Sequence, residues 1–111
     1  MDISFKSAGA EKDYNDFQRL KRLHNLARAK LIRRRLDDLR AAPVLEVMRK
    51  LPGRCHELKS DREGQLSIDL DGPYRLIFRP AHNPIPRKAD GGLDCNKVTS
   101  ITIMEFVDTH D

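Results

Sequence analysis

Two polar clusters of the chain contain the residue types that cleavage of a phosphodiester needs. His56 begins a charged run that includes Lys59 and Arg62, and Asp108 and His110 follow an apolar segment. Cleavage of RNA without a metal requires a base for the 2′-hydroxyl, an acid for the departing 5′-oxygen and cations for the phosphate. Histidine titrates near neutral pH, and lysine and arginine neutralise phosphate charge. The residue types permit this chemistry, although a histidine considered singly is more often structural and a polar terminus often frays.

The first half of the chain has a helical pattern that would support such residues. A short strand is expected at residues 3–5, followed by two helical pieces between residues 11 and 40. In the first piece apolar residues recur every three positions, from Tyr14 to Leu23. Asn25 is the expected N-cap of the second piece, and Pro43 follows its end. Residues 44–50 then read as a short helical turn.

The second half alternates apolar and polar residues, which is typical of strands. Strands are expected at 56–58, 66–70, 74–79 and 100–107, with a hairpin turn at Asp71-Gly72 and the third of these in a central position. Arg75 and Arg79 lie on that central strand and add cations to the candidate chemistry. The order predicts a single α+β domain over residues 1–111, with helices packed on one face of a mainly antiparallel sheet.

Residues 80–97 contain three prolines and two consecutive glycines and have no apolar period. We expect an extended loop there. It either contacts a partner or is a tolerated insertion without fixed structure, and the insertion is the favoured interpretation.

Positive charge is concentrated on the helical segment. Nine basic and two acidic residues between Arg19 and Arg40 give +7, whereas the whole chain carries +4. Such a field suits a polyanion or an acidic protein surface, and a solvated helix face is an equally good interpretation of the composition alone.

Several classes of protein and site are not expected. No segment reaches membrane-spanning length, and the first residues lack the apolar core of a signal peptide, which predicts a cytoplasmic protein. Cys55 and Cys95 are then reduced thiols. Cysteine and histidine show no metal-ligand spacing, so neither a metal site nor another cofactor is expected.

Linked motifs in the second half resemble the HigB branch of RelE-type toxins. These motifs are Leu51-Pro52-Gly53, the run from His56 to Gly64, the run from Leu66 to Arg79, and the end from Phe106 to His110. The family pattern has His-Pro-Leu-Lys-Gly-Asp-Arg-x-Gly, a Trp-Arg-Ile-Thr-Phe strand and a closing Asp-Tyr-His. The resemblance implies the RelE-like fold, in agreement with the pattern of elements.

The resemblance also implies roles for individual residues. His56 and His110 become the acid–base pair, Asp108 orients a neighbouring group or contacts RNA, and Lys59 and Arg75 hold the scissile phosphate. Further contacts to RNA or phosphate are expected from seven basic residues: Arg62, Arg79, Arg28, Lys30, Arg33, Arg34 and Arg35. An ion pair of Arg62 with Asp61 or Glu63 is an equal alternative.

This chain departs from the family pattern at three places. Thr109 replaces a tyrosine, and threonine cannot stack on a base. Leu66 and Tyr74 stand where the family has tryptophan, which is interpreted as repacking of the core, and Tyr74 itself is a candidate core residue. The segment 80–97 is longer than the family's turn.

The resemblance implies the toxin of a type II toxin–antitoxin system, an endoribonuclease that cuts mRNA on the ribosome. Its partner would be a HigA-like helix-turn-helix antitoxin, which would bring it to DNA only indirectly. Two alternatives are a ParE-like inhibitor of DNA gyrase, which needs no acid–base pair, and a catalytically degenerate member that only binds antitoxin.

Overall fold

A computed structural model describes residues 1–108 of the chain. Its five strands form one sheet in the order β1-β5-β4-β3-β2, with β4 at the centre. Strand β1 pairs in parallel with β5, and the other three pairings are antiparallel. The predicted α+β fold is therefore confirmed. The elements are β1 (Asp2–Phe5), α1 (Ala8–Asn15), α2 (Phe17–Leu23), α3 (Leu26–Ala41), α4 (Leu45–Met48), β2 (His56–Glu57), the 3-10 turn η1 (Ser60–Arg62), β3 (Leu66–Asp69), β4 (Tyr74–Pro80) and β5 (Ser100–Asp108).

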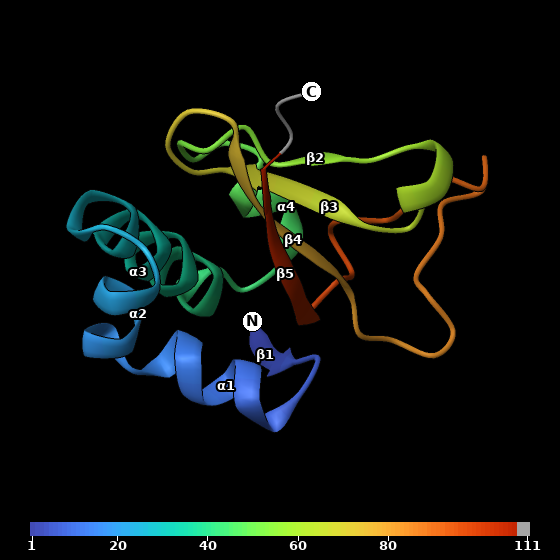
Figure 1. Cartoon of the computed structure of the whole chain (residues 1–111). Coiled ribbons are helices and arrows are strands. Elements are labelled where there is room, and N and C mark those ends of the chain that lie inside the picture. The colour runs from blue at the N-terminus through green and yellow to red at the C-terminus, as the bar shows by residue number, and fades with distance from the viewer. Residues whose placement is uncertain (109–111) are drawn as a thin grey trace.

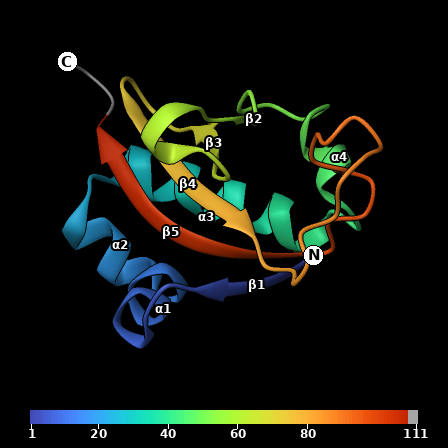
Figure 2. The same ribbon diagram turned by 90° about the vertical axis from the view of Figure 1, so that its right-hand side faces the viewer.

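The helices cover one face of the sheet. Helix α3 runs behind β4 and β5, and α1 and α2 lie beside it (Figures 1 and 2). Aliphatic side chains dominate the core between these layers, and Phe78 at the centre of the sheet is fully buried. The alternation of β4 turns Leu76 and Phe78 toward the helices, so Arg75 and Arg79 point to the opposite face.

Local capping sets the ends of the helices. The Asn25 side chain accepts a hydrogen bond from the backbone N of Arg28 at 2.8 Å, so the predicted N-cap is confirmed. The expected single helix before it is instead divided at Asp16, whose carboxylate accepts from the backbone N of Gln18 and of Arg19. Because of this break, the apolar residues before and after Asp16 no longer lie on one helix face, and Leu23 is 57% exposed.

The hairpin between β3 and β4 turns at the predicted place. Gly72 has a positive φ of 53°, and the backbone N of Tyr74 donates to the Asp71 carbonyl at 3.0 Å. Glycine adopts this backbone conformation without the strain that a side chain would add.

Gly53 lies at a second tight point, before β2. Its φ is 114°, and a Cβ there would lie 2.8 Å from Ile68 and 2.9 Å from the Nε of Arg35. The absence of a side chain at this position lets Arg35 pass and donate to the Asp69 carbonyl at 3.2 Å.

After Pro80, the last residue of β4, residues 81–97 have no helix or strand beyond one bridge between Arg87 and Leu93, yet they are packed against the domain. The Cys95 and Val98 carbonyls accept hydrogen bonds from the first backbone N–H groups of α4, at 3.1 and 3.0 Å. These bonds replace a side-chain cap, which Val44 cannot provide. Leu93 and Cys95 are buried. The expected extended loop is present, but the interpretation as an insertion without fixed structure is wrong.

Candidate active site

The face of the sheet away from α3 holds the candidate catalytic residues of β2, β3 and β4. Pairing across four strands places His56, Ser67, Ile77 and Glu105 in one row. Three strand spacings separate the ends of this row, which corresponds to about 14 Å between the Cα atoms of His56 and Glu105. Ile77 is only 1% exposed although it lies outside the hydrophobic core cluster, so this face is itself partly covered.

Arg62 reaches across this face of the sheet. From η1 its guanidinium reaches Glu105 on β5, with 2.7 Å between Nη1 and the carboxylate. Arg62 therefore forms an ion pair, but not the one considered from the sequence, because its partner is 43 residues away and is neither Asp61 nor Glu63. Glu105 had not been singled out in the sequence, because its position opposite Ile77 depends on the irregularity in the pairing of β4 with β5.

His56 is held in a defined orientation at the edge strand. Its Nδ1 lies 2.8 Å from the carbonyl oxygen of Arg54. A carbonyl oxygen can only accept a hydrogen bond, so Nδ1 carries the proton and Nε2 is the nitrogen left for proton transfer. Arg54 has a positive φ of 50°, an uncommon conformation for a residue with a side chain, and this turn directs its carbonyl toward the ring.

Arg75 lies two residues from this row and is already engaged. Its Nε lies 2.9 Å from the Asp69 carboxylate, and its Nη1 donates to the carbonyls of Gly72 and Tyr74 at 2.8 Å each. Asp69 also binds the Arg54 guanidinium. Three of the five N–H groups of Arg75 are used within the described residues, so its Nη2 is the group that remains for a phosphate.

The other predicted phosphate contacts on this side of the molecule are accessible. Lys59 is exposed just beyond β2, and Arg79 is exposed on β4 opposite Thr102. Both face solvent on or beside the surface that carries His56, where they would meet a strand of RNA.

Asp108 lies at the end of β5, and the structure does not bring it together with His56. It pairs with Tyr74, and by alternation along β5 it shares the side of Phe106, which packs against the helices. Arg75 and His56 lie on the other side. His110 and Thr109 fall outside the described residues, so the predicted pairing of His56 with His110 stays a prediction.

The basic residues of α3 divide into paired and accessible ones. Arg35 is 8% exposed and lies against Gly53, so its predicted role as a surface contact to phosphate is wrong. Arg28 is held by Asp71 through two hydrogen bonds of 2.8 and 3.0 Å, and its guanidinium lies 3.5 Å from the centre of the Tyr74 ring. The Tyr74 ring is partly buried against the hydrophobic core and also packs against this cation.

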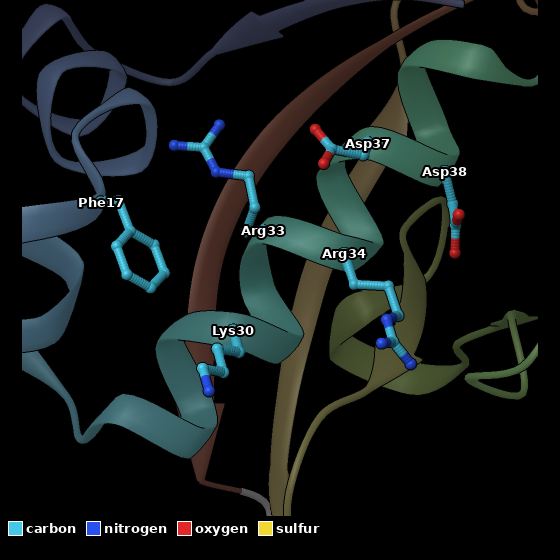
Figure 3. A pocket seen from close by; sticks show the side chains of 6 residues that line it. All are labelled: Phe17, Lys30, Arg33, Arg34, Asp37 and Asp38. Atoms are coloured by element: carbon cyan, nitrogen blue, oxygen red, sulfur yellow. The ribbon is translucent and has the colours of Figure 1, made fainter.

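Lys30 and Arg33 lie in a groove between α2 and α3, where Lys30 is exposed and Arg33 is half-buried and donates a long hydrogen bond of 3.5 Å to the Asn15 carbonyl. The groove is lined by Phe17 from α2 and by charged side chains of α3, with Lys30, Arg33 and Asp37 on the side toward Phe17 (Figure 3). Arg34 also lines this groove, from the other flank of α3 (Figure 3), and is exposed. Three cations of the predicted set therefore lie at the surface of α3.

An aromatic cluster at the junction of α2 and α3 contains His24, to which the sequence assigned no role. The His24 ring packs edge-on against Phe106, with 4.7 Å between the ring centres. Burial, followed by the nearby Arg28 charge, lowers the pKa of His24. Low-polarity surroundings favour the neutral imidazole, so this histidine is suited to packing rather than to proton transfer.

Neither metal binding nor membrane insertion has support in the described part of the chain. Within residues 1–108 no three metal-binding side chains come together in a suitable group. No helix in this range combines the length and apolar character needed to cross a membrane.

Comparison with known proteins finds no matching family profile and no matching curated protein sequence. Two solved structures are similar. A YoeB/ParE toxin from Agrobacterium tumefaciens has a TM-score of 0.59 and 12% identity, over 99% of this chain and 100% of the other. The YoeB–YefM complex from Staphylococcus aureus has a TM-score of 0.55 and 21% identity, over 100% of this chain and 98% of the other. The chain therefore has the α+β fold of YoeB/ParE toxins.

Proposed function

We propose that this protein is the toxin of a type II toxin–antitoxin system and a ribosome-dependent endoribonuclease that inhibits translation by cutting mRNA. The observation that carries the proposal is the position of His56, held through Nδ1 and with no partner of Nε2 among residues 1–108, on a toxin-like sheet whose same face carries Arg75 and Arg79, with Lys59 just beyond β2. The motif resemblance to the HigB branch supports the same assignment.

In the proposed reaction one histidine removes the proton from the 2′-hydroxyl of the substrate. The 2′-oxygen forms a bond to phosphorus while the bond from phosphorus to the 5′-oxygen breaks. A proton from the second histidine goes to the departing 5′-oxygen. The products are a 2′,3′-cyclic phosphate and a 5′-hydroxyl end, and the two acid–base groups are His56 and His110.

The cations have separate tasks in this proposal. Lys59 and the Nη2 group of Arg75 stabilise the negative charge that develops on the phosphate oxygens. Arg62 and Arg79 contact the flanking phosphates, for which Arg62 must exchange its bond to Glu105. Asp108 orients a neighbouring group or contacts RNA.

The surface cations of α3 support a role in docking. Lys30, Arg33 and Arg34 would bind ribosomal RNA phosphates, contacts that weaken as salt concentration rises. Arg28 would join them only by leaving Asp71. An acidic antitoxin, which we propose to be HigA-like, would neutralise the toxin by binding the same positive surface.

Sequencing of RNA 5′-hydroxyl ends tests the proposal. The wild type and a His56→Ala/His110→Ala variant are induced briefly in a bacterial host, and the variant's fold is checked by its thermal unfolding. We expect new ends inside translated frames, at codon-related positions, with the wild type alone. Inhibition of translation by added ribosome-binding drugs should remove these ends if cleavage depends on the ribosome.

The same experiment separates the alternative activities. Growth arrest that persists without new RNA ends, and equally in the double variant, would reject the nuclease and favour a toxin that acts as ParE-like proteins do. Absence of both arrest and new ends would favour a member that only binds antitoxin.

A further inference from the structure

A cleft beside Lys59 has no role in the function proposed above. It lies between the turn that follows β2 and the 80–97 segment, has a volume of about 450 Å³, and is lined by Glu57, Leu58, Lys59, Glu63, Gly64 and Arg87. A volume of this size is within the range of about 300–1,000 Å³ that small-molecule sites occupy. The long segment supplies one of its walls through Arg87.

The cleft carries four charged side chains that do not neutralise one another. Lys59 and Arg87 are cations, Glu57 and Glu63 are anions, and all four are exposed. Among the ion pairs of residues 1–108, none joins any of these four. Arg87 makes only a long hydrogen bond of 3.4 Å, to the Gly91 carbonyl. Two donors and two acceptors therefore face one space and are available to a ligand.

A smaller cavity of about 50 Å³ adjoins the cleft and shares Glu57, Gly64 and Arg87 with it. The side-chain oxygen of Gln65, which also lines this cavity, is buried and has no hydrogen-bond partner among residues 1–108. The space is sufficient for a water molecule, so water can link this oxygen to a ligand in the larger cleft. The site thus combines carboxylate and amide acceptors with two cations.

We propose that this cleft, at the edge of the sheet beside β2, binds one guanine nucleotide of the RNA strand. Lys59 and Arg87 hold the backbone phosphate, and the carboxylates of Glu57 and Glu63 accept hydrogen bonds from the base. Guanine presents two adjacent donors, N1–H and the 2-amino group, which match the two oxygens of a carboxylate. The Watson–Crick edges of adenine, cytosine and uracil place acceptors beside their donors, and these acceptors repel a carboxylate.

The cations and the carboxylates of the cleft have different tasks in this proposal. A cation on a phosphate increases affinity for every sequence, whereas contacts to base edges discriminate between sequences. Arg87 therefore sets affinity and the two glutamates set preference. That the nucleotide belongs to an mRNA substrate rests on the function proposed above, but the binding itself can be measured separately.

Binding to RNA that cannot be cut tests the cleft. The probes are fluorescein-labelled 2′-O-methyl hexanucleotides of uridine with guanosine, inosine, adenosine or uridine at one central position, and affinity is read from fluorescence anisotropy. We expect the wild type to bind the guanosine probe about 10-fold more tightly than the adenosine probe. Inosine, which lacks the 2-amino group, should bind between the two.

Three variants assign the contacts. Arg87→Ala should weaken binding of all probes about 5-fold and keep the guanosine preference, since it removes one contact to phosphate. Its matched control is Lys88→Ala, an exposed neighbour that does not line the cleft. Glu57→Ala/Glu63→Ala should bring guanosine and adenosine affinities within 2-fold. Thermal unfolding checks that each variant is folded.

Two results would overturn the inference. One is equal binding of all probes by the wild type, and the other is an Arg87→Ala variant that matches Lys88→Ala. Because these probes are not cleaved and no ribosome is present, the result is independent of the nuclease proposal. New 5′-hydroxyl ends in cells together with unselective binding would support the nuclease and reject the cleft as a guanine site. Selective binding of the guanosine probe without new ends in cells would support the guanine site and reject the nuclease.

Discussion

Arg28 and Asp71 form an ion pair between α3 and the β3–β4 hairpin whose removal should destabilise the fold. Two hydrogen bonds of 2.8 and 3.0 Å join them, and their side chains are 15% and 33% exposed. Hydrogen bonds to charged groups contribute about 1.5–3 kcal/mol each when a partner is lost, whereas exposed pairs contribute about 0.2–1 kcal/mol. With Asp71 one-third exposed, solvent screening reduces the pair's coupling energy to about 1.5 kcal/mol.

A double-mutant cycle measures this coupling. Arg28→Ala, Asp71→Ala and the double variant are unfolded in urea, and unfolding is followed by circular dichroism. Arg28→Ala should cost about 2–2.5 kcal/mol, because it also removes the contact to Tyr74, which contributes about 0.5–1 kcal/mol. For a domain of this length that loss lowers the Tm by about 8–10 °C.

The pH dependence provides a second measurement of the same pair. The hydrogen bond from Arg28 lowers the pKa of Asp71 below its ordinary value, so the stabilisation is fully present above about pH 4. It is lost as the pH falls through the lowered pKa of the folded state. Asp71→Asn should lack this component of acid destabilisation. A coupling energy below about 0.5 kcal/mol, with an unchanged acid profile, would refute the structural role of Arg28 and return it to the predicted contacts with RNA.

Three further outcomes are expected. Gly53→Ala should cost at least about 2 kcal/mol in urea unfolding, because its Cβ would clash, whereas Gly64→Ala, with positive φ but open space, should cost about 1 kcal/mol; equal costs would contradict this account. Phe78→Ala should lower the free energy of unfolding by about 3–5 kcal/mol in the same assay, and a loss below about 1 kcal/mol would contradict its place in the core. Burial raises the pKa of Cys55 to about 12 and also raises that of Cys95, so both thiols should resist Ellman's reagent at pH 8 until urea unfolds the protein; rapid reaction of the native protein would contradict their burial.

The sequence alone was sufficient for the features that depend on neighbouring residues. The order of elements, the Asn25 cap and the Asp71-Gly72 turn follow from periodicity and from side chains that act within four positions. The Asp16 cap is also a local feature, but the apolar spacing of the segment predicted one continuous helix across it. Aliphatic burial on one face of the sheet likewise follows from alternation along the strands.

The tertiary structure decided which charged residues are paired. The sequence places Arg28, Lys30, Arg33, Arg34 and Arg35 in one basic run, but helical geometry directs them to different sides of α3, one into the core and one to Asp71. Their partners lie 34 and 43 residues away along the chain, beyond the range of any local pattern.

The same reason applies to the candidate site. Arg62 was expected either to contact RNA or to pair with a carboxylate beside it in the sequence, whereas the folded sheet brings Glu105 within 2.7 Å. The 80–97 segment had no local signal of order, yet its carbonyls cap α4 and Arg87 reaches the cleft beside Lys59. Local patterns determine which elements form, while the pairing of distant groups depends on the packed fold, because only packing brings them within hydrogen-bonding distance.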